Sequence, residues 1–309
     1  DGIRDLVRSR GLGDVYKRQV STIAGQESSG YNNGLGSQAK FESPNCIGID
    51  SKGNLFVSDS GGLSNLSNIR KITPNGQNWY VSTFLSDFSG NFTIDNQDNL
   101  IFNQRGVVLK ISSNGESSVI ADTSGFVFNN NGDSNNGACR PVIDSNGNVF
   151  LIGTDRILKV NSTGEYSLFY EKIDGEFTIN NSALGFISDA VIDSNDNIYL
   201  TEIESPVGCN IEKGNAVIRK ITPEGNLSIV FDGRNQSSAN SISRLYNPYG
   251  LTVDSEGNIF VSDGGNKKIK KINSSGEISV VSGGIYGNYD YSDYQSYFST
   301  FLNIIGFNN

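Results

Sequence analysis

The side chains that most often carry out chemistry in proteins are scarce in this sequence. Its 309 residues include no histidine and only three cysteines. Histidine is the commonest general base and transition-metal ligand near neutral pH, so its absence excludes Ser-His-Asp triads, histidine-ligated zinc and histidine-dependent lyases. Cys46, Cys139 and Cys209 lack the spacing of a metal site, and an odd number cannot all pair with one another. The pattern favours small buried thiols over a disulfide or a reactive nucleophile.

Carboxylates recur in a turn that occurs five times, in which an Asp and a short polar stretch precede an Asn and an apolar strand. The five anchors are Asp50, Asp95, Asp144, Asp193 and Asp254. The text DSNGN at 144–148 begins like a calcium loop, but no glutamate follows at the distance that such a loop needs. Because every copy has the same turn, we predict that these carboxylates bond turn amides, and we predict no metal and no cofactor.

Positions at which the copies differ are more informative than those they share. The residues four before each anchor are Cys46, Asn91, Arg140, Asp189 and Gly250, and those nine after it are Asp59, Gln104, Gly153, Glu202 and Asp263. A purely structural role predicts small or apolar residues at the first position. We therefore predict a polar pocket of Asn91, Arg140, Asp189 and Glu202, with Gln104 beside them. The alternative is that Arg140 and Asp189 only pair with each other as a solvated lid.

Each anchor belongs to a unit of four short strands. The unit continues with a third strand of the type IRKI, at 69–72, 108–111, 157–160, 218–221 and 269–272, then a tight turn and a fourth β-rich run. No amphipathic helical stretch interrupts it, and the anchors are 45, 49, 49 and 61 residues apart. Four-stranded units at this period are typical of propeller blades. A Greek-key sandwich would not be expected to repeat the same strand and turn motif five times. The sequence predicts an all-β propeller of four-stranded antiparallel blades.

Residues 1–19 differ in composition from everything that follows. They carry five basic and three acidic side chains, so the remainder has a charge of −11, against −9 for the whole chain. Their text is typical of a translated adaptor sequence, and we interpret them as a non-native leader. The native part is expected to be a single propeller domain over 20–309 and to belong to a larger polypeptide.

The repeats resemble the NHL-repeat family of six-bladed propellers, most closely at 44–76 and 247–276. That resemblance implies a ring but no single activity, because such propellers include RNA binders, interaction modules, sensors and enzymes. It also implies that Asp59 and Asp263 bond turn amides at a corner of the blade. The run VSTIA at 20–24 matches a fourth strand, and 301–307 match the start of a first strand. We therefore predict five complete blades and an incomplete sixth, in an open ring.

Function is expected on the face that carries the long connections, such as 26–40, 122–138 and 284–300. Tyrosines in two of these loops are candidate contacts: Tyr31, Tyr286, Tyr289, Tyr291 and Tyr294. The leading hypothesis is a non-catalytic propeller that binds a protein or glycan partner on this face and at the channel mouth. Seven Asn-x-Ser/Thr triplets fit an extracellular or cell-surface location.

The same residues are compatible with two other functions. One is a carboxylate-based hydrolase that resembles the lactonase or strictosidine-synthase-like six-bladed propellers, with Asp189 and Glu202 in the site. The second is nucleic-acid binding, which the negative charge argues against because phosphates need a basic face. The chain also lacks the run of about 18 to 20 apolar residues that a membrane-spanning helix needs, so no membrane insertion is expected.

Overall fold

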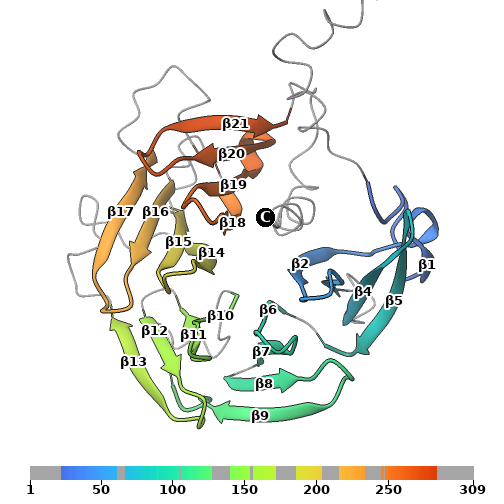
Figure 1. The fold of residues 1–309 in the computed structure, drawn as a ribbon, viewed down its shortest axis with the longest axis horizontal. Helices are drawn as coiled ribbons and strands as arrows, with labels where there is room; N and C mark the ends of the chain where they lie inside the picture. Colours follow the sequence, from blue (N-terminus) through green and yellow to red (C-terminus); the bar gives the residue numbers. More distant parts are fainter. Residues whose placement is uncertain are drawn as a thin grey trace, which may run out of the picture.

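The computed structural model describes residues 22–60, 67–88, 90–104, 106–126, 140–153, 156–171, 186–203, 216–233, 245–246 and 248–283. These residues form five antiparallel sheets arranged in a ring, and in each sheet the strand that leads into the anchor Asp lies nearest the centre (Figure 1). The predicted β-propeller is confirmed. Within the described residues, no helix has the length and apolar character to cross a membrane.

Each blade consists of four strands that pair in chain order. Blade one is β2 (Pro44–Ile49), β3 (Leu55–Ser60), β4 (Ser67–Asn75) and β5 (Asn78–Ser86). Blade two is β6 (Phe92–Ile94), β7 (Leu100–Gln104), β8 (Val107–Ile111) and β9 (Ser117–Asp122). Blade three is β10 (Val142–Ile143), β11 (Val149–Ile152), β12 (Arg156–Val160) and β13 (Tyr166–Glu171). Blade four is β14 (Phe186–Ile192), β15 (Ile198–Ile203), β16 (Ala216–Ile221) and β17 (Leu227–Asp232). Blade five is β18 (Pro248–Val253), β19 (Ile259–Asp263), β20 (Lys268–Ile272) and β21 (Ile278–Ser282).

One strand was not expected from the sequence. β1 (Gly34–Leu35) pairs antiparallel with β5 and adds a fifth strand at the outer edge of blade one, where the sequence indicated a long loop. Its two residues have no strong strand preference of their own. The pairing therefore depends on how the rest of this loop is held in place.

The anchor aspartates bond the amides of their own turns, as predicted. The Asp50 carboxylate accepts hydrogen bonds from the backbone N–H groups of Lys52 (3.0 Å) and Asn54 (2.8 Å), and the other four anchors repeat this arrangement. Each also accepts from the side-chain amide of the Asn that ends the turn. Among the residues that the structure describes, no group of three or more metal-ligating side chains comes together.

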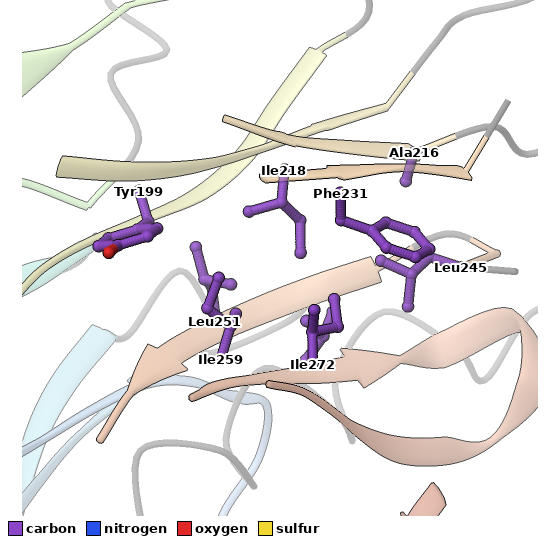
Figure 2. Packing of buried hydrophobic residues seen from close by; sticks show 9 residues of the cluster. Tyr199, Ala216, Ile218, Phe231, Leu245, Leu251, Ile259 and Ile272 are labelled. Carbon is purple, nitrogen blue, oxygen red and sulfur yellow. The ribbon is translucent and has the colours of Figure 1, made fainter. Parts of the chain in front are cut away.

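Apolar side chains fill the spaces between successive blades. Between blades four and five, Tyr199, Ile218 and Phe231 pack against Leu251 and Ile272 (Figure 2). Comparable clusters join blades one and two, two and three, and three and four. The second strands of blades two, three and four are thus covered on both faces by neighbouring blades, which explains why their sequences are largely apolar instead of alternating.

No comparable cluster joins blade five to blade one among the described residues, and Figure 1 shows a wider interval between these two blades than between other neighbours. On blade one, Ile23 and Ala24 pack on the face that points into this interval. Ile120 and Ala121, from the outer strand of blade two, pack on blade three in the same way. The described blades form an open ring, and residues 22–24 reach the place of an outer strand. The predicted start of a sixth blade lies outside the described residues.

Candidate functional site

Residues from different blades meet at the centre of the ring. Arg140, just before β10, donates a hydrogen bond from Nε to the carbonyl oxygen of Phe92 in β6 (3.1 Å). The Cys46 thiol of β2 points to the same carbonyl oxygen, at 3.5 Å. Three blades are therefore joined by one backbone acceptor. The position four residues before each anchor, noted in the sequence, supplies both of these donors.

Asp189 in β14 extends this network to blades four and five. It is 8% exposed, and its carboxylate accepts hydrogen bonds from the backbone N–H groups of Ala190 and Leu251, each at 2.9 Å. Burial raises the pKa of Asp189 to about 6, although the Arg140 guanidinium and both N–H groups favour the charged form. A carboxyl group with this pKa titrates in the mildly acidic range.

Electrostatics link the three side chains. Burial raises the pKa of the Cys46 thiol, and the nearby Arg140 charge opposes that rise only in part. Cys46 therefore stays a neutral thiol at neutral pH. Arg140 is half-buried, in contrast to the buried Cys46 and Asp189, so it is the most exposed member of the group.

The structure brings Arg140 and Asp189 into one network, and it places the other predicted pocket residues differently. Asn91 is exposed and directly precedes Phe92, and Gln104 is half-buried at the end of β7. Glu202 is buried, and its Oε2 accepts a hydrogen bond from Nε of Arg219 at 2.6 Å. Cys46 completes the network, and only its shared position before the anchor could have indicated this from the sequence.

The ion pair of Glu202 belongs to a set that recurs in three blades. The acidic residue ends the second strand and the basic residue lies in the third. The pairs are Asp59–Arg70 (3.2 Å), Glu202–Arg219 (2.6 Å) and Asp263–Lys270 (2.6 Å). Blades two and three carry Leu109 and Leu158 at the basic position. The acidic position at the end of the second strand and the basic position in the third strand vary together among the five repeats. Comparing these two positions would have predicted the pairs from the sequence.

Two of these acids also fix loop backbones, as the family resemblance implied. Asp59 accepts hydrogen bonds from the N–H groups of Glu42 (2.8 Å) and Ser43 (2.9 Å). Asp263 accepts from the N–H of Tyr246 (2.6 Å) and from the side-chain amide of Asn266 (2.7 Å). These carboxylates are thus occupied in positioning the blade corners.

Arg70 organises the loop that holds β1. Its guanidinium donates to the carbonyl oxygens of Lys40 (2.9 Å) and Asn32 (3.0 Å) and to the side-chain oxygen of Asn33 (2.7 Å). Half-buried Tyr31 lies within electrostatic range of this guanidinium. The other predicted contact tyrosines, Tyr286, Tyr289, Tyr291 and Tyr294, lie outside the described residues, as do Cys139 and Cys209.

The recurring lysine of each third strand stacks on its cross-strand partner. In four blades the partner is aromatic, with the lysine Nζ 5.3 to 5.7 Å from the ring centroid. In blade two the partner is Ile101, and Lys110 approaches Asp95 at 3.6 Å instead. The expected packing of the lysine stems is thus supplemented by cation–π contacts.

Neither a protein-family model nor a curated protein matches this chain. Among solved structures, it resembles a structural genomics protein of unknown function from Bacteroides thetaiotaomicron, with a TM-score of 0.63, 18% identity, and coverage of 86% of this chain and 64% of that one. It also resembles an auxiliary nutrient binding protein from Bacteroides ovatus (TM-score 0.56, 11% identity, 84% and 63%). A streptogramin B lyase is similar as well (TM-score 0.51, 16% identity, 81% and 71%).

At these identities the likeness shows the fold alone. The chain spans less than two thirds of the length of the two Bacteroides proteins. Their fold and the one described here agree, and the neighbours include both a binding protein and an enzyme. The choice between binding and catalysis must therefore be argued from the residues at the ring centre.

Proposed function

We propose that this protein is a non-catalytic binding propeller of the NHL type, which takes a glycan or protein partner at the mouth of its central channel and on the long-loop face. The observation that carries the proposal is the meeting of Arg140 and Asp189 at the ring centre. They come from different blades, at a position where a structural role requires only small or apolar side chains. Arg140 is only half-buried there, and a partly exposed charged group placed where the blades converge is typical of a ligand site.

Two further points support binding over catalysis. The 309 residues offer no histidine as a general base or metal ligand. Glu202, the second carboxylate that a hydrolase would use, is held by Arg219 inside blade four. A fold neighbour that is named as an auxiliary nutrient binding protein also fits a binding role. We place this role outside the cell or at its surface, in keeping with the seven Asn-x-Ser/Thr triplets.

Binding to arrays of glycans and of peptides tests the proposal, followed by calorimetry on the strongest partner. Arg140→Gln should weaken the binding at least tenfold, because a charged hydrogen-bond donor at the mouth is lost. Lys159→Gln is the matched control, since it removes a charge from the same blade at a side chain that is 35% exposed and faces Asp144. Equal affinity of both variants for the partner, or no partner in either array, would contradict the proposal.

A carboxylate-based hydrolase is the second candidate, and the raised pKa of Asp189 favours it. A carboxyl group with a pKa of about 6 is suited to general acid–base catalysis near neutral pH. A panel of lactones and esters, assayed with the wild type and with Asp189→Asn, tests this alternative. Hydrolysis by the wild type that the variant loses, with the variant still folded, would favour the enzyme over the binding protein.

A further inference from the structure

We propose that the flank of blade five that faces the interval in the ring is a docking surface for one further blade, and that this blade carries an aspartate in its anchor turn. The surface combines Ser255, as a two-point donor to that aspartate, with the apolar cluster of Phe260, Ile269 and Val281. The occupant is a four-stranded blade of the same polypeptide, of the kind that blades two and four represent. The proposal does not depend on what the ring centre binds.

The anchor turns of neighbouring blades are joined by one serine and one aspartate. The backbone N–H and the hydroxyl of Ser51 in blade one donate to the two carboxylate oxygens of Asp98 in blade two, both at 2.7 Å. Ser145 of blade three donates to Asp196 of blade four in the same way, at 2.8 and 2.7 Å. The same two-point contact at two interfaces indicates a rule of assembly for the ring.

The two acceptors occupy a position at which the other blades have glycine. Asp98 and Asp196 have φ values of 63° and 61°. The equivalent residues of the other blades are glycines, each with a φ of 79°: Gly53, Gly147 and Gly257. A side chain is disfavoured in this left-handed region, although aspartate tolerates it better than most residues. The bond to the preceding blade therefore explains why an aspartate stands there.

The apolar residues of the interfaces alternate in the same order. Six residues after the anchor, blades one and three have Phe56 and Phe150, and each packs with residues of the blade that supplies the aspartate. Blades two and four have Ile101 and Tyr199 at this position. Blade five has Phe260, and its turn has the serine and the glycine of blades one and three. Blade five is therefore built to receive an aspartate-bearing blade.

The flank that would receive it faces the interval. Blade four packs on Ile259 and Val261, so Phe260, which lies between them in the strand, points to the opposite side (Figure 1). Ser255 is exposed, and no hydrogen bond from it to another described residue is seen. Phe260 and Ile269 are nonetheless only 4% exposed, which fits an occupant carried by the same polypeptide.

Blades two and four specify what this occupant presents. Three residues after its anchor each has the aspartate, and five and seven residues after it each has an apolar side chain that packs on the preceding blade: Leu100 and Phe102, Ile198 and Leu200. The predicted first strand at 301–307 leads into such a turn, because 301 aligns with 41 and Asp50 lies nine residues after 41. The further blade should thus have an aspartate and two apolar residues at these positions.

Extending the chain directly after Asn309 with a second copy of residues 95–116 tests the proposal. This graft supplies the sequence of β7 and β8 with the aspartate of blade two. The matched graft is a copy of residues 144–165, which supplies β11 and β12 with the glycine of blade three. Urea unfolding is followed by the fluorescence of Trp79, the one tryptophan of the chain, because it packs on the flank of blade one that borders the interval.

The blade-two graft should raise the urea midpoint more than the blade-three graft does. In the blade-two graft, Ser255→Ala should lower the folding equilibrium constant about five- to tenfold, because two hydrogen bonds to a carboxylate are lost. Asp98→Gly in the grafted copy should have the same effect, and the two changes together should cost no more than either one. Ser194→Ala is the control, since the next turn along the ring has Gly257, and it should change nothing in either graft.

Equal gains from the two grafts, or no gain from either, would overturn the proposal. An effect of Ser255→Ala that is the same with and without the grafted aspartate would also overturn it. A dimer of the 309-residue chain that Ser255→Ala dissociates, seen by analytical ultracentrifugation, would assign the flank to a second copy instead.

A variant of the 309-residue chain tests the pairing of serine and aspartate without a graft. Gly257→Asp places a carboxylate one blade beyond Ser194, and a Cβ at this glycine has no atom within 4 Å. Ser194→Ala should then lower the urea midpoint of Gly257→Asp but not that of the wild type. Equal midpoints of Gly257→Asp with and without Ser194 would overturn the assembly rule and the proposal with it.

Discussion

Replacing Arg219 with leucine should destabilise the protein more than replacing Arg219 and Glu202 together. The two side chains form a buried ion pair in blade four, with Nε and Oε2 at 2.6 Å and exposures of 6% and 9%. Blade two provides a natural alternative at the same positions, with Gln104 and Leu109. The double variant E202Q/R219L therefore installs in blade four a combination that the same fold already accommodates.

The expected magnitudes follow from desolvation. Arg219→Leu leaves the Glu202 carboxylate buried without its cation, which costs about 3–5 kcal/mol. Replacing a whole buried pair with uncharged residues of similar volume is often close to neutral, so the double variant should lose less than about 2 kcal/mol. The coupling energy between the two positions is then at least about 1 kcal/mol. Lys220→Met, at the half-buried cation–π position next to Arg219, is the control and should cost about 1 kcal/mol or less.

Urea unfolding, followed by circular dichroism, measures these differences in five proteins: the wild type, E202Q, R219L, E202Q/R219L and Lys220→Met. The slope of the transition must be the same for each protein, because the free energies are comparable only if a similar surface is exposed on unfolding. Losses in E202Q and R219L that add up to the loss in the double variant within about 0.5 kcal/mol would show that the two positions are not coupled. An R219L variant that loses no more stability than Lys220→Met would show that the buried ion pair is not important for stability.

Three further outcomes are expected. Because burial raises the pKa of Asp189 from 3.8 to about 6, the folded chain holds this proton more tightly than the unfolded chain does. The contribution of Asp189 to the free energy of unfolding should therefore fall by about 2 kcal/mol as the pH rises from 4 to 6, and the urea midpoints of Asp189→Asn should lack this fall. Ser51 donates two 2.7 Å hydrogen bonds to a carboxylate in the adjoining turn of blade two, so Ser51→Ala should lower the melting temperature and Ser194→Ala, for which no such bond is seen, should not. A Cβ on Gly48 would lie 2.9 and 3.0 Å from side chains of blade two, so Gly48→Ala should cost about 1–3 kcal/mol in urea unfolding, whereas Gly125→Ala, which has open space, should be nearly neutral.

The blades were predictable because each repeat specifies its own structure. The anchor Asp bonds the amides of its own turn, and the flanking strands are long enough to pair within the unit. The residues that make such contacts lie close together in the sequence, so the same motif recurs in every repeat. β1 has no such motif, because Gly34 and Leu35 depend on a strand and an arginine that lie 35 or more residues further along the chain.

The ring centre was predictable only in part. Position relative to the anchor pointed to Arg140 and Asp189 together, because equivalent residues of a propeller face the same axis, and each charge influences the other in the structure. It gave no information on what else each side chain contacts. Glu202 occupies the position of Asp59 and Asp263, and its partner is set by the register between the second and third strands. Pairing across strands has to be known before a buried carboxylate can be assigned to a site or to a scaffold.

The contrast between the cations of this protein separates these two roles. Arg70 and Lys270 have fully buried side chains and each pairs with an acid of its own blade, so their removal should mainly lower stability. Arg140 is half-buried, and it contacts Phe92 of blade two and faces Asp189 of blade four. Because partly exposed charges contribute little to folding, Arg140→Gln should reduce binding with a loss of stability of about 1 kcal/mol or less. A large loss of stability in Arg140→Gln, similar to that of Arg70→Gln in urea unfolding, would identify Arg140 as part of the scaffold instead.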